Sequence, residues 1–226
     1  MISPAQEMDS EWRAHMAQNA EQLIETVKQA RVIPVIIMDD VDQARPAAEA
    51  LVAGGLNVLE VTLRTPNALK VIEEMAKVDG AVLGSGTVRS AEHMRQSAGA
   101  GCQFMVSPGA TPKLLEAAED MTIPLLPGIG SPTEAMIAAE RGYTFLKFFP
   151  AEAMGGTKVL KAFQSPLPEL VFCPTGGVSA SNAMDYLSLS NVVCVGGSWV
   201  LPADALESRD FNRIEALARE ANLLGL

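Results

Sequence analysis

The stretch CQFMVSPGATPKLLEAAEDMTIPLLPG, residues 102–128, contains the structural unit that recurs along the chain. Two short apolar runs of strand length flank the segment TPKLLEAAED, which begins with the Thr-Pro pair typical of a helix start. Parallel strands that are neighbours need a crossover connection, which is usually a helix. The stretch therefore predicts a strand, a helix and a second strand parallel to the first.

Short apolar runs alternate with helical patterns to the end of the chain. The runs are RVIPVIIM from Arg31, NVLEVTL from Asn57, AVLGSGT from Ala81, CQFMVS from Cys102, IPLLPG from Ile123, YTFLKFFP from Tyr143, LVFCPTGG from Leu170 and NVVCVGGS from Asn191. Eight such units in a chain of 226 residues favour a closed TIM (β/α)8 barrel over an open doubly wound sheet. We expect one α/β barrel domain over residues 1–226.

Residues 1–30 are expected to form an N-terminal helical extension of this barrel. Met16, Leu23, Ile24 and Val27 recur there at helical spacing. The segment is too polar and acidic for a signal peptide, and no later apolar run approaches the length that spans a membrane. We therefore expect a cytoplasmic protein with no membrane partner.

The three cysteines, Cys102, Cys173 and Cys194, are far apart and form no CxxC pair. This pattern is typical of reduced thiols that pack as small hydrophobic side chains. The formal net charge of −10 provides no basic surface for the phosphate backbone of a nucleic acid. We expect no nucleic-acid partner and a reducing compartment.

Metal chemistry has little support in the composition. The only histidines are His15 and His93, too few for a histidine-rich metal cluster or a histidine-centred triad. Asp39, Asp40 and Asp42 could suggest a divalent cation, but helix capping explains them with fewer assumptions. We expect no metal and no cofactor.

The run NVLEVTLR places an acid, a hydroxyl and a guanidinium two residues apart, at Glu60, Thr62 and Arg64. Alternate residues of a strand share one face, so these three side chains are expected together. In TIM barrels the reactive side chains lie at the C-terminal ends of the strands. A solvated strand end is the alternative interpretation.

Lys147 lies within FLKFF, which is too apolar for an exposed edge strand, and shares a face with Phe145 and Phe149. Desolvation disfavours an ammonium ion and so favours the free amine that imine formation requires. A lysine paired with a carboxylate, or one extending to the barrel mouth, is the alternative. Because the second and sixth strands lie opposite each other, Glu60 could meet Lys147 across the barrel.

Two glycine-rich segments, PTGGVS and VGGSWVLPADAL, follow the last two strands. TIM barrels often bind phosphate through these two loops, where backbone N–H groups face the anion. Tight turns also need glycine, so a single pair would be weak evidence. The candidate phosphate ligands are Gly176, Gly177, Gly196, Gly197 and Ser198.

The segments GSGT, ending at Thr87, and SPGAT, around Pro108, place small residues at the ends of the third and fourth strands. They leave room for a ligand, although ordinary tight turns between strand and helix would explain them equally well.

The motifs EVTLRT, GSGT, SPG, PGI, KFFPAE, CPTGG and CVGGSW occur in this order over nearly the whole chain. Together they closely resemble the bacterial 2-keto-3-deoxy-6-phosphogluconate aldolases, also described as 4-hydroxy-2-oxoglutarate aldolases. Ser85 stands where close relatives are expected to have alanine. The resemblance implies a class I aldolase without a cofactor, in a homotrimer of barrels, that releases pyruvate and glyceraldehyde 3-phosphate.

The resemblance also implies roles for single residues. Lys147 matches the lysine that forms the imine, and Glu60 matches the acid–base residue. Arg64 and Thr87 match the residues that hold the pyruvyl carboxylate, a task that suits a bidentate guanidinium.

Further positions match the walls and the far end of the substrate site. Pro108 and Phe149 match residues that shape the pyruvate pocket, and Thr175 matches a hydroxyl near the reacting end of the substrate. The residues that match the phosphate site are Gly176, Gly177, Gly197 and Ser198.

Two other functions remain as alternatives. A sugar-phosphate epimerase would share the last two loops, but such enzymes use metal-binding histidines that this sequence lacks. A barrel that senses a phosphorylated sugar acid without catalysis is opposed by the presence of Lys147, Glu60 and Arg64. Among aldolase substrates, the preferred 2-oxo acid and the stereochemistry at C4 stay open.

Overall fold

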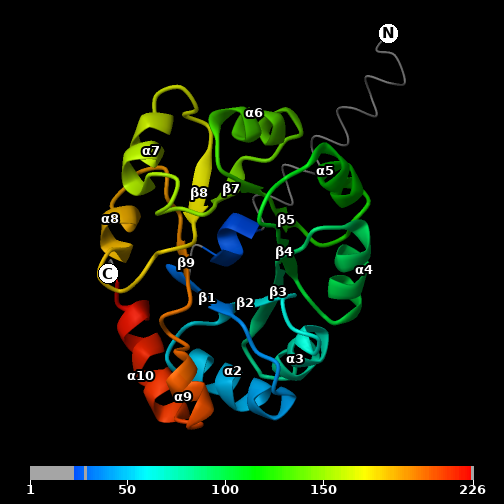
Figure 1. The fold of residues 1–226 in the computed structure, drawn as a ribbon, viewed down its shortest axis with the longest axis vertical. Coiled ribbons are helices and arrows are strands. Elements are labelled where there is room, and N and C mark those ends of the chain that lie inside the picture. The colour runs from blue at the N-terminus through cyan, green and yellow to red at the C-terminus, as the bar shows by residue number, and fades with distance from the viewer. Residues whose placement is uncertain (1–22, 28–29, 225–226) are drawn as a thin grey trace.

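The computed structural model describes residues 23–27 and 30–224, in which parallel strands form a ring with helices outside it (Figure 1). The strands are β1 Val32–Ile36, β2 Val58–Thr62, β3 Val82–Gly86, β4 Phe104–Val106, β5 Leu125–Leu126, β6 Gly128–Ile129, β7 Phe145–Phe148, β8 Val171–Pro174 and β9 Val195–Gly197. The helices are η1 Val41–Gln43, α2 Ala44–Ala53, α3 Ala68–Met75, α4 Ala91–Gly99, α5 Pro112–Glu119, α6 Pro132–Glu140, α7 Gly156–Phe163, α8 Ala183–Leu187, α9 Ala203–Glu207 and α10 Phe211–Asn222.

The nine strand segments occupy eight positions in the ring. One sheet runs β5-β4-β3-β2-β1-β9 and the other runs β6-β7-β8. Segments β5 and β6 are one predicted strand, interrupted by Pro127, which has no N–H to donate. The isolated bridge between Thr175 and Gly196 connects the end of β8 to β9. The ring is therefore closed, and the predicted (β/α)8 barrel is confirmed.

The strands alternate between an inner and an outer apolar layer, as expected for a barrel. Ile33, Phe104 and Phe145 pack in the inner layer, whereas neighbours such as Leu146 belong to the layer beneath the helices. The helical turn of residues 23–27 lies inside the ring in Figure 1. Its side chains pack with residues at the N-terminal ends of the strands, so it closes this end of the barrel.

The predicted helix starts are present where Ser or Thr precedes proline. The Thr111 hydroxyl accepts a hydrogen bond from the N–H of Leu114, and the Ser131 hydroxyl accepts one from Glu134. The aspartates after β1 also act in capping, as expected, because the Asp40 carboxylate accepts from the N–H of Asp42 at 3.0 Å.

All three cysteines are buried free thiols. Burial raises the pKa of Cys102 to about 12. Contact with the Cys173 thiol, together with burial, holds the pKa of Cys194 well above its ordinary value. The interpretation of these residues as packed, reduced thiols agrees with this environment.

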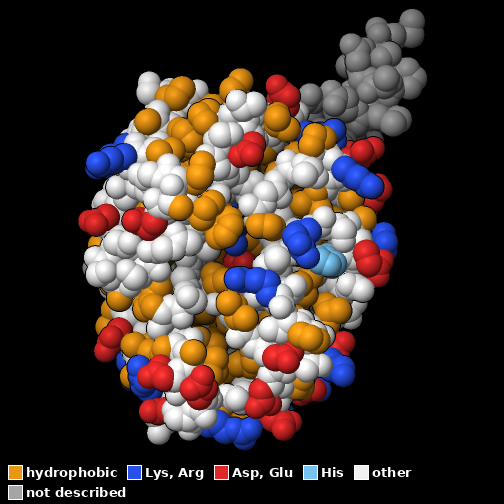
Figure 2. Space-filling view, viewed as in Figure 1, with side chains coloured by type: hydrophobic (Ala, Val, Ile, Leu, Met, Phe, Trp, Pro, Cys, Tyr) orange, Lys and Arg blue, Asp and Glu red, His pale blue; other side chains and the backbone are white. Residues whose placement is uncertain are grey.

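The face of the molecule that contains the barrel mouth is hollowed at its centre, with Lys and Arg side chains beside the hollow (Figure 2). None of the helices in the described ranges is long and apolar enough to cross a membrane.

Candidate active site

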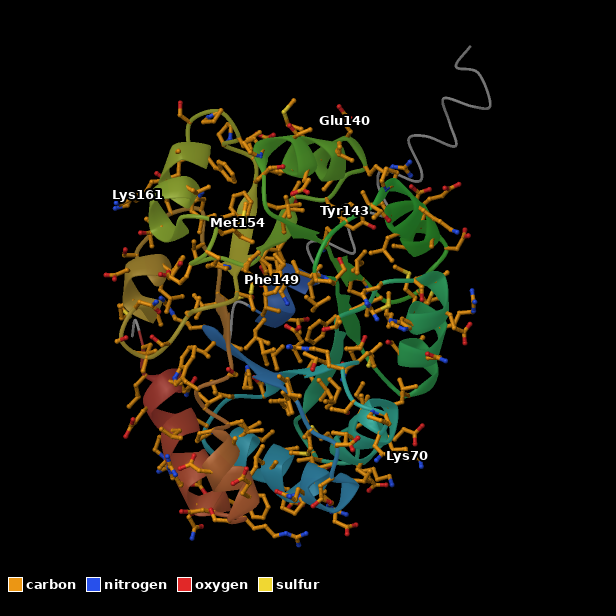
Figure 3. The ribbon with its side chains drawn as sticks, viewed as in Figure 1. Lys70, Glu140, Tyr143, Phe149, Met154 and Lys161 are labelled. Atoms are coloured by element: carbon orange, nitrogen blue, oxygen red, sulfur yellow. The ribbon has the colours of Figure 1, made fainter. Side chains whose placement is uncertain are left out.

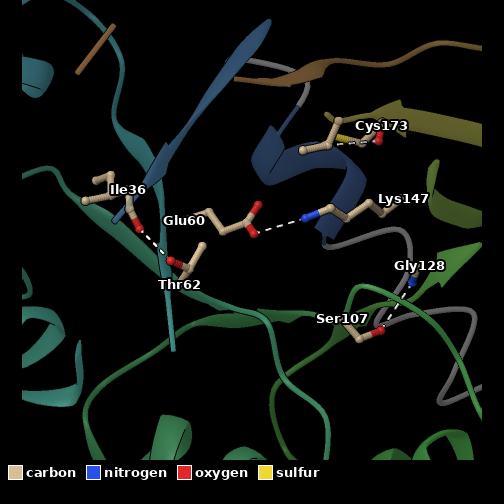
Figure 4. Close-up of polar contacts among 8 residues, drawn as sticks. Ile36, Glu60, Thr62, Ser107, Gly128, Lys147 and Cys173 are labelled. Carbon is tan, nitrogen blue, oxygen red and sulfur yellow. Dashed lines mark hydrogen bonds and ion pairs between the residues drawn. The ribbon is translucent and has the colours of Figure 1, made fainter. Parts of the chain in front are cut away.

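Lys147 and Glu60 meet inside the barrel (Figure 4). Lys147 Nζ donates a hydrogen bond to Glu60 Oε1 at 3.1 Å, and the two side chains are 6% and 4% exposed. They come from β7 and β2, which lie on opposite sides of the ring (Figure 1). The prediction that these two residues could meet across the barrel is therefore confirmed.

The backbone around Lys147 is fixed on both sides. Lys147 pairs in register with Gly128 of β6 and with Cys173 of β8, and its N–H donates to the carbonyl of Pro127 at 2.9 Å. Its amine lies 5.5 Å from the ring centroid of Phe149, within the range of a cation–π contact. The amine is thus held by one anion and one aromatic ring.

The position of the Glu60 carboxylate depends on the absence of a side chain at Gly86. A Cβ atom on Gly86 of β3 would overlap Glu60 Oε1 and would lie 2.9 Å from Glu60 Cγ and Cδ. The GSGT segment was expected to leave room for a ligand, but Gly86 leaves room for the Glu60 carboxylate and Gly84 leaves room for Phe104. No signal in a single sequence identifies the neighbour for which a glycine makes space.

Ser85, between these glycines, faces away from the site. Its register partners are Val61 and Met105, whose side chains lie in the outer apolar layer, and its buried hydroxyl has no hydrogen-bond partner among the described residues. The Ser85 side chain therefore does not contribute to the environment of Glu60.

Arg64 lies just beyond the end of the strand on which it was predicted. The expectation that strand alternation places it on the face of Glu60 and Thr62 is wrong, because β2 ends at Thr62 and Arg64 lies in the following turn. The Thr62 hydroxyl is buried and donates to the carbonyl of Ile36 at 2.9 Å. Arg64 is exposed, and no ion pair joins it to another residue within the described ranges.

Thr87 follows the neighbouring strand β3 at the same edge of the barrel. The N–H of Leu63 donates to the carbonyl of Gly86 at 2.8 Å, which connects the chain segments just before Arg64 and Thr87. Thr87 has a φ of 61°, an uncommon value for a residue with a side chain. The structure therefore places both candidate carboxylate ligands on adjacent turns at the C-terminal edge.

Pro108 lies against the strand next to Lys147. A Cβ atom on Gly128 would lie 2.5 Å from the backbone carbon of Pro108, so the glycine permits this close approach. Ser107, for which the sequence predicted no separate role, is buried, and its hydroxyl accepts a hydrogen bond from the N–H of Gly128 at 3.2 Å. The SPG loop is thus attached to the register partner of Lys147.

The two glycine-rich loops are joined through Thr175, which is almost completely buried. Its backbone bridges to Gly196, where a Cβ atom would overlap the Thr175 hydroxyl oxygen. Gly176 and Gly177 have φ values of 96° and 82°, in the left-handed region that favours glycine. Gly197 and the exposed Ser198 follow Gly196 on the neighbouring segment, so the structure brings the candidate phosphate ligands to adjacent strand ends.

Comparison with known proteins agrees with this geometry. The family model described as KDPG and KHG aldolase matches residues 23–217. The chain is 52% identical over 191 residues to the 2-dehydro-3-deoxy-phosphogluconate aldolase of Dickeya dadantii, covering 84% of this chain and 90% of the relative. It is 51% identical over 191 residues to the KHG/KDPG aldolase of Escherichia coli K12, with the same coverage.

Solved structures are similar over the same region. The 2-keto-3-deoxy-6-phosphogluconate aldolase of Zymomonas mobilis ZM4, in a structure with 3-phosphoglycerate, superimposes with a TM-score of 0.85 and 47% identity, covering 89% of this chain and 95% of that chain. The aldolase of Legionella pneumophila, with pyruvate captured as a covalent carbinolamine, gives 0.82 and 44% identity, covering 84% and 93%.

The barrel, the buried amine with its carboxylate and these similarities define the class of protein as a class I, imine-forming aldolase. Within that class, the chain belongs to the KDPG and KHG aldolase family.

Proposed function

We propose that this aldolase cleaves 2-dehydro-3-deoxy-6-phosphogluconate to pyruvate and glyceraldehyde 3-phosphate through an imine at Lys147. The observation that carries the proposal is the 3.1 Å contact between the buried Lys147 amine and the Glu60 carboxylate. An amine that attacks a ketone needs a group that moves protons within hydrogen-bond reach, and Glu60 is at that distance.

In the proposed mechanism, the Glu60 carboxylate carries out the successive proton transfers. Glu60 takes a proton from the Lys147 ammonium group, the freed amine attacks the C2 ketone, and Glu60 returns the proton with which the carbinolamine loses water. The iminium then accepts the electron pair of the C3–C4 bond, while Glu60 takes the proton of the C4 hydroxyl and the aldehyde forms. Glu60 next protonates the enamine at C3, and water releases pyruvate and the free lysine.

Arg64 and Thr87 hold the pyruvyl carboxylate in this proposal. Their positions on adjacent turns at the C-terminal edge support the assignment. The Arg64 guanidinium, which forms no ion pair with a described residue, also suits bidentate binding of a carboxylate. Pro108 and Phe149 form the walls around the pyruvyl group. Phe149 lies near the centre of the ring in Figure 3, and its ring faces the Lys147 amine.

The phosphate end of the substrate binds the two glycine-rich loops, with Thr175 near the reacting carbons. The bridge that brings these loops together supports this assignment. The proposed phosphate ligands are Gly176, Gly177, Gly197 and Ser198. The relatives named KHG/KDPG aldolase support 4-hydroxy-2-oxoglutarate, which has no phosphate, as a second substrate.

Assembly as a homotrimer in the cytoplasm completes the proposal. Met136 of α6 is 52% exposed and Met154, in the loop after β7 and labelled in Figure 3, is 42% exposed, so both offer apolar surface to another copy. Light scattering coupled to size-exclusion chromatography tests the assembly. A mass of one protomer at micromolar concentration would contradict it.

The decisive test of the chemistry is incubation with pyruvate and borohydride, followed by peptide mass spectrometry. We expect a reduced pyruvyl adduct on Lys147 and none in the folded Lys147→Ala variant, which also loses turnover. A parallel assay of pyruvate release from the phosphorylated substrate separates an aldolase from a barrel that only binds. No adduct on folded wild-type protein with excess pyruvate would overturn the imine mechanism.

A further inference from the structure

A hydrogen bond connects two strand–helix units at the proposed phosphate end of the site. The Tyr186 hydroxyl of α8 donates to Glu152 Oε1 in the loop between β7 and α7. The Tyr186 side chain is fully buried, whereas Glu152 is exposed. The contact therefore joins residues 34 positions apart in the chain, one in the loop before α7 and one in helix α8, on either side of β8.

The Glu152 side chain packs directly on the PTGG turn, residues 174–177. A Cβ atom on Gly177 would lie 2.6 Å from both Cβ and Cγ of Glu152. On the other side, a Cβ atom on Gly156 would lie 3.0 Å from the Tyr186 hydroxyl and 3.2 Å from Glu152 Oε1. Glycine at both positions is therefore what permits the close packing of this pair.

Backbone hydrogen bonds attach the same loop to the same turn. The N–H of Glu152 donates to the carbonyl of Gly176 at 3.0 Å, and the N–H of Ala151 donates to the carbonyl of Thr175 at 2.8 Å. The side chain and the backbone of Glu152 thus both fix the position of the turn. A displacement of Glu152 would move Gly176 and Gly177 together.

Glu152 itself is unsuited to bind the phosphate, because a carboxylate repels an anion at short range. Tyr186 is suited to hold this carboxylate, since burial and its hydrogen bond to Glu152 raise the pKa of its phenol. Its hydroxyl accordingly remains a neutral donor at ordinary assay pH.

We propose that Glu152 and Tyr186 are positioning residues that fix the PTGG turn, and so set the affinity of the enzyme for phosphorylated substrates. The proposal rests on the phosphate site assigned under the proposed function. Within the described part of the chain, neither residue of the pair forms a hydrogen bond with Lys147 or Glu60, so the pair acts on the phosphate end and not on the imine.

The test compares a phosphorylated substrate, 2-dehydro-3-deoxy-6-phosphogluconate, with an unphosphorylated one, 4-hydroxy-2-oxoglutarate. Tyr186→Phe removes only the hydroxyl, and Glu152→Gln keeps an oxygen that accepts the hydrogen bond. The matched control is Tyr143→Phe, because the Tyr143 hydroxyl is buried without a hydrogen-bond partner in the described structure. Glu152→Ala replaces Tyr186→Phe if that variant does not fold.

We expect Tyr186→Phe to lower kcat/KM for the phosphorylated substrate about five- to tenfold, mainly through KM, since one hydrogen bond is lost. Activity on the unphosphorylated substrate and the rate of borohydride trapping with pyruvate should change less than about twofold, because that loss is confined to the phosphate end. Glu152→Gln and Tyr143→Phe should both retain the wild-type ratio of kcat/KM between the two substrates.

The possible failures are distinguishable. If Tyr186→Phe reduces activity on both substrates equally, or on neither, the positioning role is overturned while the phosphate site stands. If wild-type enzyme shows no preference for the phosphorylated substrate, the phosphate site itself is removed and the inference falls with it. Circular dichroism of each variant confirms that the barrel has formed.

Discussion

The Lys147 amine and the Glu60 carboxylate form a hydrogen-bonded ion pair in the resting enzyme, although the two residues are 87 positions apart in the chain. The proposed nucleophile and its proposed proton partner are therefore in contact before any substrate binds. Because both side chains are almost completely buried, the same contact bears on catalysis and on folding stability.

Glu60→Gln should lower kcat about 10²- to 10⁴-fold, the usual contribution of a positioned acid–base group. The amide cannot take up the C4 hydroxyl proton, but the Lys147 amine remains available for attack. Borohydride trapping with pyruvate should therefore still give an adduct on Lys147, at a reduced rate. Steady-state kinetics that match the wild type would assign the proton transfers to another group.

Lys147→Met should destabilise the protein by about 3–5 kcal/mol, because the Glu60 carboxylate stays buried without its partner. The double variant Lys147→Met/Glu60→Gln leaves no buried charge at this position and should regain most of that stability. Urea unfolding at pH 7 measures both. Equal stability of the single and double variants would show that the ion pair is not the source of the loss.

Gly86→Ala should displace the Glu60 carboxylate, since the added methyl group would overlap it. We expect a loss in kcat on the order of 100-fold, the effect of a misplacement of about 1 Å at a reacting group. Gly99→Ala is the matched control, because a Cβ atom there meets no atom within 4 Å. That helical substitution should leave kcat unchanged and stabilise the protein by about 0.5–1 kcal/mol. Normal kcat in Gly86→Ala would contradict the assigned contact.

The stability of the protein should fall above pH 9 because of Cys102. Burial raises the pKa of this thiol from 9.0 to about 12, so above pH 9 the unfolded chain loses a proton that the folded chain retains. The resulting stability is fully present below pH 9 and is lost as the pH rises toward 12, by about 1.4 kcal/mol per pH unit. Between pH 8 and pH 10, Cys102→Ala should lose about 1.4 kcal/mol less than wild type in urea unfolding. Identical losses would place the titration elsewhere.

The barrel could be predicted from the sequence because the same pattern recurs along the chain. Strand-length runs and helix start signals recur at every unit, and the opposition of the second and sixth strands then places Glu60 near Lys147. The interruption at Pro127 was not predicted. The apolar run IPLLPG from Ile123 looks the same in the sequence whether it forms one strand or the two short segments β5 and β6. Prediction of Arg64 on the strand face failed because alternation applies only as far as the strand extends, and β2 ends at Thr62.

Contacts of individual glycines with side chains from other segments could not be predicted from the sequence. The roles of Gly86 and Gly177 depend on which side chain lies opposite them, Glu60 in one case and Glu152 in the other. A glycine in a motif indicates that space is needed, but only the three-dimensional structure identifies what fills that space.

The helical turn of residues 23–27 has a consequence for the order in which products leave. Leu23 and Val27 pack among the inner apolar residues and fill the N-terminal end of the described barrel. Small molecules therefore enter and leave through the C-terminal mouth. In the proposed mechanism the pyruvyl group stays covalently bonded to Lys147 after the C3–C4 bond breaks, whereas the aldehyde is no longer attached to the enzyme. The aldehyde must therefore depart first, so in the direction of synthesis pyruvate loads before it and the kinetics are ordered.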